Sequence, residues 1–247
     1  MIYIKKNEEV EKMREANIIV RDVLLLLEEK LRAGMSTKEL DEIAYKYIIS
    51  CGAKPSFLGY HGYPASVCVS IDEQVVHGIP SDRIIKEGEI VSVDVGAVIN
   101  GFHGDAARSI YCGSITPEKK RLIDVTRECF FKGIEGLQNG TPLYDIGAKV
   151  QKHAEENGYS VVRALVGHGI GREMHEDPSV PNYGKMGTGV RLKTNMTIAI
   201  EPMINMGTLD VDFLSDGWTV VTRDRKPSAH YENTILIKDN GVEILTL

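Results

Sequence analysis

Four carboxylates and one histidine interrupt stretches of sequence that otherwise have the pattern of apolar strands. They are Asp94, Asp105, His168, Glu201 and Glu232. A carboxylate directed into an apolar sheet is energetically costly unless a cation meets it. Four such carboxylates together with an imidazole therefore predict a metal site, and with it metal-dependent chemistry.

The first two aspartates are expected to lie on the same face of a β-hairpin. Side chains alternate along a strand, so Asp94 and Gly96 share one face while the neighbouring valines share the other. Asn100-Gly101 predicts a two-residue hairpin turn, which places Asp105 opposite Gly96 and diagonal to Asp94. Gly96 would leave the space between the two carboxylates empty. Carboxylates this close repel unless they share a proton or a cation. The alternative is that Asp105 merely ends a strand and Asp94 pairs with Arg108.

The second half of the chain repeats this pattern. Glu201 ends an apolar strand at Pro202, and Glu232 shares a strand face with His230. For each glutamate alone, a salt-bridged residue or a residue at the rim of the sheet is an open alternative. His168 is flanked by glycines that would give its backbone freedom to reach a ligand, although a histidine in such a turn can also be structural.

The donor set indicates which metals would bind. Oxygen-rich sites with one imidazole suit Mn²⁺, Fe²⁺, Co²⁺ or Zn²⁺. Five side chains exceed what one tetrahedral ion needs, so two divalent ions bridged by carboxylates fit better. Such a pair activates water for hydrolysis.

Composition and charge exclude several classes of protein. The 247 residues carry a net charge of −6, which does not favour binding to nucleic acid or to an anionic membrane. The four cysteines have no CxxC spacing, and neither a signal peptide nor a run of 18 apolar residues is present. We expect a cytoplasmic monomer with reduced thiols.

Helical periodicity returns about 106 residues after its first occurrence. The pattern predicts helices over 7–32, with Asn7 as N-cap, and from Ser36 or Thr37 to near Gly52. Two more helices are predicted from Pro117 to Gly140 and from Thr141-Pro142 to near Gly158.

An internal repeat follows from these helices. Aligning Gly34 with Gly140 also aligns Gly52 with Gly158, and with one residue of slack Asp94 falls on Glu201. We therefore expect a single α+β domain over 1–247 with an internal repeat, its halves spanning roughly 1–115 and 116–247.

Eight short motifs, in order along nearly the whole chain, resemble those of the methionine aminopeptidases, in their short bacterial type I form. The motifs are Leu58-Gly-Tyr-His-Gly-Tyr-Pro64, Ser66-Val-Cys-Val-Ser70, Val76-His-Gly-Ile-Pro80, Val93-Asp-Val-Gly96, Gly104-Asp105, Gly167-His-Gly-Ile-Gly171, Glu201-Pro202 and Ala229-His-Tyr-Glu232. The resemblance implies the pita-bread fold, with two pseudo-symmetric α/β halves around a central antiparallel sheet. It also implies removal of the initiator methionine from nascent polypeptides whose second residue is small.

The resemblance implies a role for each of the five metal-site residues. Asp94 would chelate one ion, Asp105 and Glu232 would bridge both, and His168 and Glu201 would complete the other. Glu201 would also act as general base. His77 and His175 would face the substrate and hydrogen-bond the scissile amide and the developing oxyanion.

A methionine pocket is implied as well. Its walls would be Phe57, Tyr60, Tyr63, Cys68, Met174 and Trp218, and aromatic and sulfur-bearing walls suit a thioether. Phe57 stands where the family often has a cysteine, and Met174 where it often has an aromatic residue. Both changes keep the wall apolar, so methionine preference should survive.

Two other functions stay open on the sequence alone. A proline-specific peptidase of the same fold usually carries an additional N-terminal domain and lacks the wall formed by Tyr60 and Tyr63. A metal-free binding protein would have lost its ligands, whereas all five positions here carry competent residues. No ribosome-docking extension or insert is visible, so we expect any proximity to the ribosome to be transient.

Overall fold

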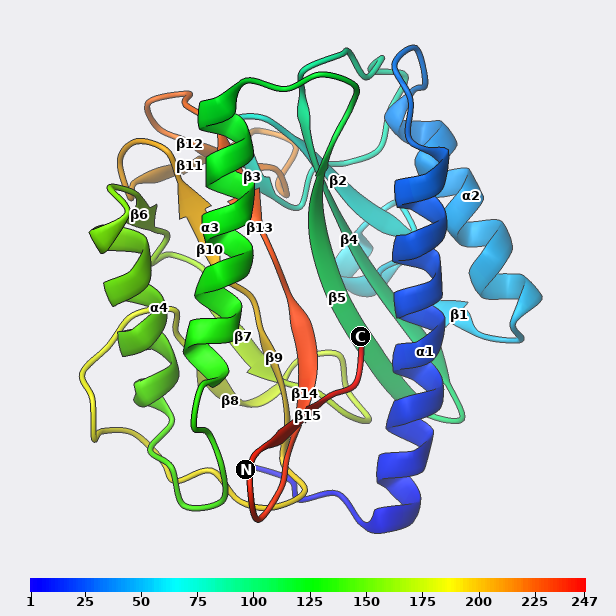
Figure 1. Ribbon diagram of the computed structural model, residues 1–247. Helices are drawn as coiled ribbons and strands as arrows, with labels where there is room; N and C mark the ends of the chain where they lie inside the picture. Colours follow the sequence, from blue (N-terminus) through cyan, green and yellow to red (C-terminus); the bar gives the residue numbers. More distant parts are fainter.

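The computed structural model describes all residues 1–247 as four α-helices and several antiparallel sheets (Figure 1). The helices are α1 (Asn7–Lys30), α2 (Thr37–Ser50), α3 (Pro117–Ile134) and α4 (Tyr144–Glu156), with a 3₁₀ turn at Tyr60–Gly62. The strands are β1 (Lys54–Pro55), β2 (Val67–Ile71), β3 (Gln74–Val76), β4 (Ile90–Ile99), β5 (Phe102–Tyr111), β6 (Ser160–Val161), β7 (Gly167–Gly169), β8 (Glu176–Val180), β9 (Thr197–Ile200), β10 (Met203–Asn205), β11 (Val211–Phe213), β12 (Val220–Thr222), β13 (Ser228–His230), β14 (Asn233–Ile237) and β15 (Val242–Ile244).

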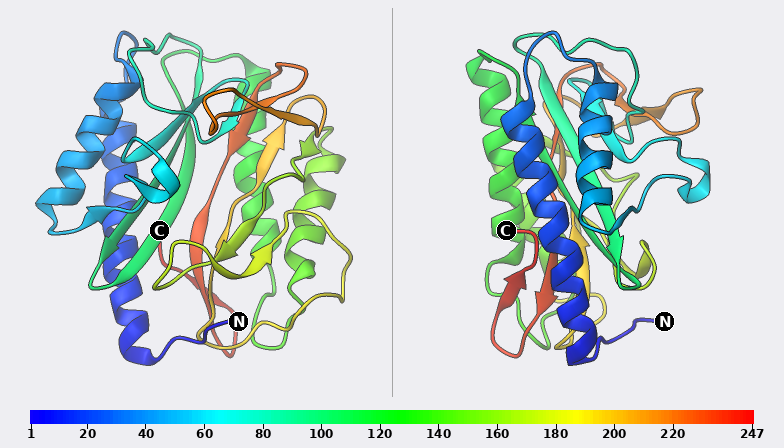
Figure 2. Two further views of the ribbon diagram at one scale, coloured as in Figure 1. Left: turned by 180° about the vertical axis from the view of Figure 1, so that it is seen from behind. Right: turned by 90° about the vertical axis from the view of Figure 1, so that its right-hand side faces the viewer.

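The long helices α1 and α3 cover the same face of the strands (Figures 1 and 2). Helix α1 packs on β4 and β5, and α3 packs on β10 and β13. No helix is both long and apolar enough to span a membrane. All four cysteines are unpaired, as their spacing predicts.

All four predicted helices are present, and the N-terminal ends of α1, α2 and α3 follow local chemistry. Ser36 caps α2 by accepting a hydrogen bond from the Glu39 N–H at 3.2 Å. Pro117 is the first residue of α3, after the N-cap Thr116. The N-cap of α1 is Lys6 instead of the predicted Asn7, because the Glu9 carboxylate accepts the Lys6 N–H at 2.8 Å.

Three predicted helix boundaries are wrong. Helix α1 ends at Lys30 instead of residue 32, α3 ends at Ile134 instead of Gly140, and α4 begins at Tyr144 instead of Thr141-Pro142. At Gly140 the chain is in a turn with φ of 87°, and the Gly140 N–H bonds the carbonyl of Leu192 at 2.8 Å. This long-range pairing competes with helical hydrogen bonds and is invisible to helical periodicity.

The backbone confirms that the two halves are pseudo-symmetric. Gly34 and Gly140 follow the first helix of each half with φ of 91° and 87°, and Gly52 and Gly158 follow the second with φ of 73° and 79°. These left-handed conformations are those that glycine adopts without steric cost.

Long-range hydrogen bonds repeat at the same offset to within one residue. The N–H of Gly34 bonds the Ile85 carbonyl at 2.9 Å, as that of Gly140 bonds Leu192 at 2.8 Å. Isolated antiparallel bridges then join Ser36 to Ile84 in one half and Pro142 to Arg191 in the other. We propose that the halves divide between β5 and α3, near residue 115, within one domain.

The halves meet where β5 runs beside the end of β13 (Figure 1). Ala107 and Glu232 exchange both backbone hydrogen bonds, with N···O distances of 3.0 and 3.4 Å. A hydrophobic core lies under each half, one around Leu40 and Val93, the other around Ile146 and Ile198. The junction between the half-sheets is thus a place where side chains of both halves can converge.

The β4–β5 hairpin has the predicted register. Gly96 lies opposite Asp105, and the turn residues Asn100 and Gly101 have φ of 53° and 77°. The prediction that Gly96 leaves an empty space is wrong. A Cβ there would come within 2.7 Å of the Phe57 ring, so Gly96 makes room for that ring.

Gly104 allows α1 to approach β5, which generates a test of the packing. A Cβ at Gly104 would lie 2.8 Å from the backbone carbon of Ala16 and 2.9 Å from the nitrogen of Asn17. Gly104→Ala should therefore lower the free energy of unfolding by about 1–3 kcal/mol, measured by urea denaturation. Lys46→Ala on the exposed face of α2 is the control, with an expected change within about 0.5 kcal/mol. Equal stabilities for the two variants would contradict the close approach.

Candidate active site

Asp94 and Asp105 are brought together by the hairpin register. The carboxyl groups of Asp94 and Glu232 both lie close enough to Asp105 to influence its pKa. Carboxylates only accept hydrogen bonds, so such contacts require shared protons or cations. The alternative pairing of Asp94 with Arg108 is wrong, because the Arg108 guanidinium donates to the carbonyls of Ala107 and Glu232 instead.

The two glutamates come from the second half and lie just outside regular strands. Glu201 follows the last residue of β9, and its carbonyl accepts a hydrogen bond from Asn182 Nδ2 at 2.9 Å. Glu232 lies between β13 and β14. Its backbone pairing with Ala107 on β5 places it beside Asp105, so the junction of the halves itself assembles this part of the site.

His168 lies on β7, between β8 and β9. The expectation that its flanking glycines supply backbone freedom is wrong, because neither has a positive φ. A Cβ at Gly167 would lie 2.4 Å from the Ala199 carbonyl oxygen, and one at Gly169 would lie 2.1 Å from that of Asp177. The glycines therefore allow neighbouring backbone to approach closely on both sides of the histidine.

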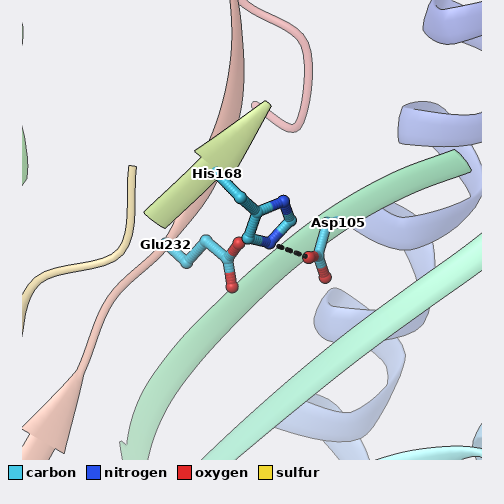
Figure 3. Close-up of side chains that lie close together, drawn as sticks. All are labelled: Asp105, His168 and Glu232. Carbon is cyan, nitrogen blue, oxygen red and sulfur yellow. Dashed lines mark ion pairs between the residues drawn. The ribbon is translucent and has the colours of Figure 1, made fainter. Parts of the chain in front are cut away.

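One hydrogen bond determines which nitrogen of His168 is free. Nδ1 lies 2.9 Å from the Gly169 carbonyl oxygen, which can only accept, so Nδ1 carries the proton. The Nε2 lone pair then faces Asp105 Oδ2 at 3.5 Å (Figure 3). It also lies 3.7 Å from Glu201 Oε1. This is the arrangement in which a buried histidine binds a metal.

Burial dominates the electrostatics of these groups. It raises the pKa of Asp94 to about 7 and raises the pKa values of Asp105, Glu201 and Glu232 well above the usual range. For the latter three, repulsion among the carboxylates adds to the effect. Burial, with a contribution from His175, lowers the pKa of His168 to about 3 and keeps its imidazole neutral.

The residues present fit divalent metal. Buried oxygens of Asp94, Asp105 and Glu232 have no hydrogen-bond partner. Ligand atoms of Asp105, His168 and Glu232 lie within 4.8 Å of one another. Unpaired buried carboxylate oxygens facing an imidazole lone pair are what hard or borderline cations require.

All thirteen residues that the sequence nominates line one cavity. They are Phe57, Tyr60, Tyr63, Cys68, His77, Asp94, Asp105, His168, Met174, His175, Glu201, Trp218 and Glu232. The five candidate ligands form its polar end, and aromatic and sulfur-bearing side chains form the rest. Trp218 stacks edge-on against Tyr63, with ring centroids 5.0 Å apart.

His77 and His175 flank this polar end. The rings of His175 and His168 have centroids 4.2 Å apart, and the Tyr60 hydroxyl lies 2.7 Å from His175 Nδ1. Burial, reinforced by His175, lowers the pKa of His77 to about 4, and burial also lowers the pKa of His175. Both imidazoles are therefore neutral near pH 7.

His230 is a residue of the site that sequence reasoning did not nominate. It is 2 % exposed, and its Nε2 has no hydrogen-bond partner, although it lies 3.8 Å from Glu201 and 3.9 Å from Glu232. The available signal was its position two residues before Glu232, on the same strand face. An alternating pattern shows the shared face but not the convergence with Glu201.

Comparison with known proteins decides the family. The model of metallopeptidase family M24 matches residues 11–239. The chain belongs to this family. The methionine aminopeptidase of Clostridium perfringens is 53 % identical over the whole chain, which covers 99 % of that protein. The crystal structure of methionine aminopeptidase from Rickettsia prowazekii has a TM-score of 0.99 and 43 % identity, with full coverage of both chains.

M24 membership confirms the pita-bread fold and the assignment of the chain as a metal-dependent peptidase that uses divalent metal. The prolidase from Pyrococcus furiosus shares the fold, with a TM-score of 0.82 and 24 % identity. The match includes 99 % of this chain but 65 % of the prolidase chain. At this identity the similarity concerns the fold alone.

The protonated carboxyl cluster generates a prediction about metal binding. Metal must displace the protons that the raised pKa values retain, so binding at about pH 6 should release about one proton per molecule or more. Calorimetric titration of metal-free protein with Mn²⁺, in buffers of different ionisation enthalpy, measures this number. It should decrease as the pH rises past the Asp94 pKa of about 7. A heat of binding that is the same in every buffer would contradict the prediction.

Proposed function

We propose that this M24 peptidase is a methionine aminopeptidase that removes the initiator methionine from nascent polypeptides with a small second residue. The observation that carries the proposal is the composition of the cavity that these thirteen residues line. Its polar end holds four carboxylates and His168, and its remaining wall is aromatic and sulfur-bearing. Such a cavity can hold a thioether side chain beside a hydrolytic centre.

We propose that two divalent ions, of Mn, Fe, Co or Zn, bind the five ligands. Asp94 would hold one ion, His168 and Glu201 the other, and Asp105 and Glu232 both. When bound, the ions would activate water and polarise the scissile carbonyl. The unpaired oxygens of Asp105 and Glu232 support their bridging role, because each carboxylate has capacity that no protein donor uses.

Glu201 is the candidate general base. Its side chain lines the cavity, and burial raises its pKa, so it can take a proton from the attacking water and deliver it to the leaving amine. Asn182 Nδ2 donates to the Glu201 carbonyl oxygen and so fixes the backbone from which this side chain extends.

The two neutral histidines would bind the amide. If the Tyr60 hydroxyl donates to His175 Nδ1, the imidazole proton resides on Nε2 and can be donated to the developing oxyanion. Tyr60 suits this role because burial raises its pKa and keeps the phenol protonated. His77, which lines the same cavity, would hydrogen-bond the scissile amide.

The apolar wall would select methionine. The Phe57 ring occupies the space above Gly96, so it limits the depth of the pocket next to the carboxylates. Met174 is buried and lines the same wall. The free amino terminus of a nascent chain would enter as the cationic partner of this acidic end. We propose that the enzyme is a cytoplasmic monomer with only transient proximity to the ribosome.

Removing one bridging carboxylate tests the metal centre. Asp105→Asn keeps the shape but loses an anionic oxygen, so methionine release should fall by about 100-fold or more, together with metal content. Peptide assays and metal analysis of the purified variant measure the two effects. Asp145→Asn, in the first turn of α4, is the control and should match the wild type. A near wild-type rate for Asp105→Asn would refute the dinuclear centre.

Substrate choice separates the proposal from a proline-specific peptidase. Metal-loaded enzyme should release methionine from Met-Gly peptides much faster than from Met-Trp peptides, and it should leave Xaa-Pro dipeptides intact. Chromatographic detection of the released amino acid measures all three. Equal rates on Met-Gly and Met-Trp would overturn the requirement for a small second residue. Cleavage of Xaa-Pro alone would indicate a prolidase.

A further inference from the structure

The loop Gly171–Asp177, which supplies Met174 and His175 to the cavity, is held by the N-terminal segment of the chain. Lys5 Nζ lies 2.7 Å from Glu176 Oε2. Glu9 accepts a hydrogen bond from Arg172 at 2.7 Å, and the terminal amine of Met1 pairs with Asp177. Each of these contacts joins residues that are more than 160 positions apart in the sequence. Together the contacts lie on both sides of Met174 and His175.

The Lys5–Glu176 pair is buried. The Lys5 side chain is 1 % exposed and that of Glu176 is 13 % exposed. Burial lowers the pKa of Lys5, and Glu176 opposes this effect. A buried ion pair is seldom the most stabilising arrangement, because apolar residues of the same volume often serve stability equally well. Its presence here therefore requires a reason other than packing.

Glu176 organises the loop as well as pairing with Lys5. Its Oε1 accepts the backbone N–H of Arg172 at 2.8 Å and that of Glu173 at 3.3 Å. A Cβ at Gly171 would lie 2.5 Å from Lys5 Cε and 2.6 Å from Glu176 Oε1, so the turn is packed tightly against the pair. The Glu176 carboxylate thus holds the turn closed through these backbone hydrogen bonds, and the ion pair with Lys5 fixes the position of that carboxylate.

The position of His175 depends on this closed turn. His175 directly precedes Glu176, which begins β8 opposite Gly169, next to His168. Movement of Glu176 would displace the His175 ring, which contacts both Tyr60 and His168. A displacement of about 1 Å at a catalytic group can cost a large factor in rate.

We propose that Lys5 is a positioning residue: through Glu176 it holds the loop Gly171–Asp177 so that His175 faces the scissile amide. The proposal rests on the proposed function in one respect, namely that His175 faces the substrate. Lys5 itself does not touch the cavity.

Lys5→Met tests the proposal, because it removes the charge and keeps the buried apolar stem. With Met-Gly peptides, kcat should fall about tenfold while KM changes less than about twofold, because His175 would act mainly on the transition state. Metal affinity, measured by calorimetry, should be unchanged. Arg14→Met is the matched control, since Arg14 also ties the N-terminal segment to a distant glutamate, Glu243, at 2.8 Å. Its kcat should match the wild type.

A double-mutant cycle shows whether Lys5 acts through His175. In a His175→Ala background, Lys5→Met should cause no further loss of kcat, whereas independent effects would multiply. Multiplying effects, a wild-type kcat for Lys5→Met, or an equal loss in Arg14→Met would each overturn the proposal.

Two further measurements keep the test decisive. Hydrogen exchange across residues 171–177 should become faster in Lys5→Met and not in Arg14→Met. This measurement does not require activity, so it remains valid even if the wild-type protein releases no methionine. Absence of methionine release would refute the proposed function and not the role of Lys5. If Lys5→Met does not fold, Arg172→Met removes the partly buried contact with Glu9 and should lower kcat about threefold. Unchanged exchange, or unchanged kcat in Arg172→Met of an active enzyme, would contradict the role of the segment.

Discussion

The structure depends on the mutual repulsion of four buried carboxylates and on the need for positive charge among them. Asp94, Asp105, Glu201 and Glu232 all line the polar end of one cavity, and burial raises the pKa of each. Without metal, protons must offset the repulsion. The repulsion among the carboxylates destabilises the metal-free cluster, and relief of that repulsion contributes to the affinity of the cluster for divalent ions.

The fold meets this demand by joining two half-sheets at the cluster. The backbone pairing of Ala107 with Glu232 crosses from one half to the other, and each half contributes carboxylates on either side of it. Behind the pair, the Arg108 guanidinium donates to both carbonyls and lies over the Tyr231 ring at 4.4 Å. Its charge opposes the rise in the pKa of Glu232, although burial outweighs it. A fixed cation thus supports the junction without occupying the cavity.

Close backbone approach is the second constraint, and glycines satisfy it. Gly104 brings α1 onto β5, while Gly167 and Gly169 bring neighbouring backbone against β7. Gly96 makes room for Phe57, and Gly171 makes room for Lys5 and Glu176. In each case a Cβ would collide with a group that positions the site. The geometry of the metal ligands and of the apolar wall therefore rests on the absence of side chains nearby.

Local sequence determined the elements and the candidate ligands. Alternation along Val91–Val95 and the Asn100-Gly101 turn were sufficient for the hairpin register and for placing Asp94 near Asp105, because both depend on residues close in the chain. The spacing of Gly34 and Gly140 was sufficient to detect the two similar halves. Family resemblance, not pattern, nominated His77 and the methionine wall.

Tertiary structure alone decided the contacts between distant segments. The early end of α3, the filling of the space at Gly96 by Phe57, the convergence of His230 with Glu201, and the contact of Lys5 with Glu176 all involve residues far apart in sequence. Periodicity and turn chemistry report only which face a side chain occupies within its own element. Which partner meets that face depends on how the two halves pack, and this is a property of the whole chain.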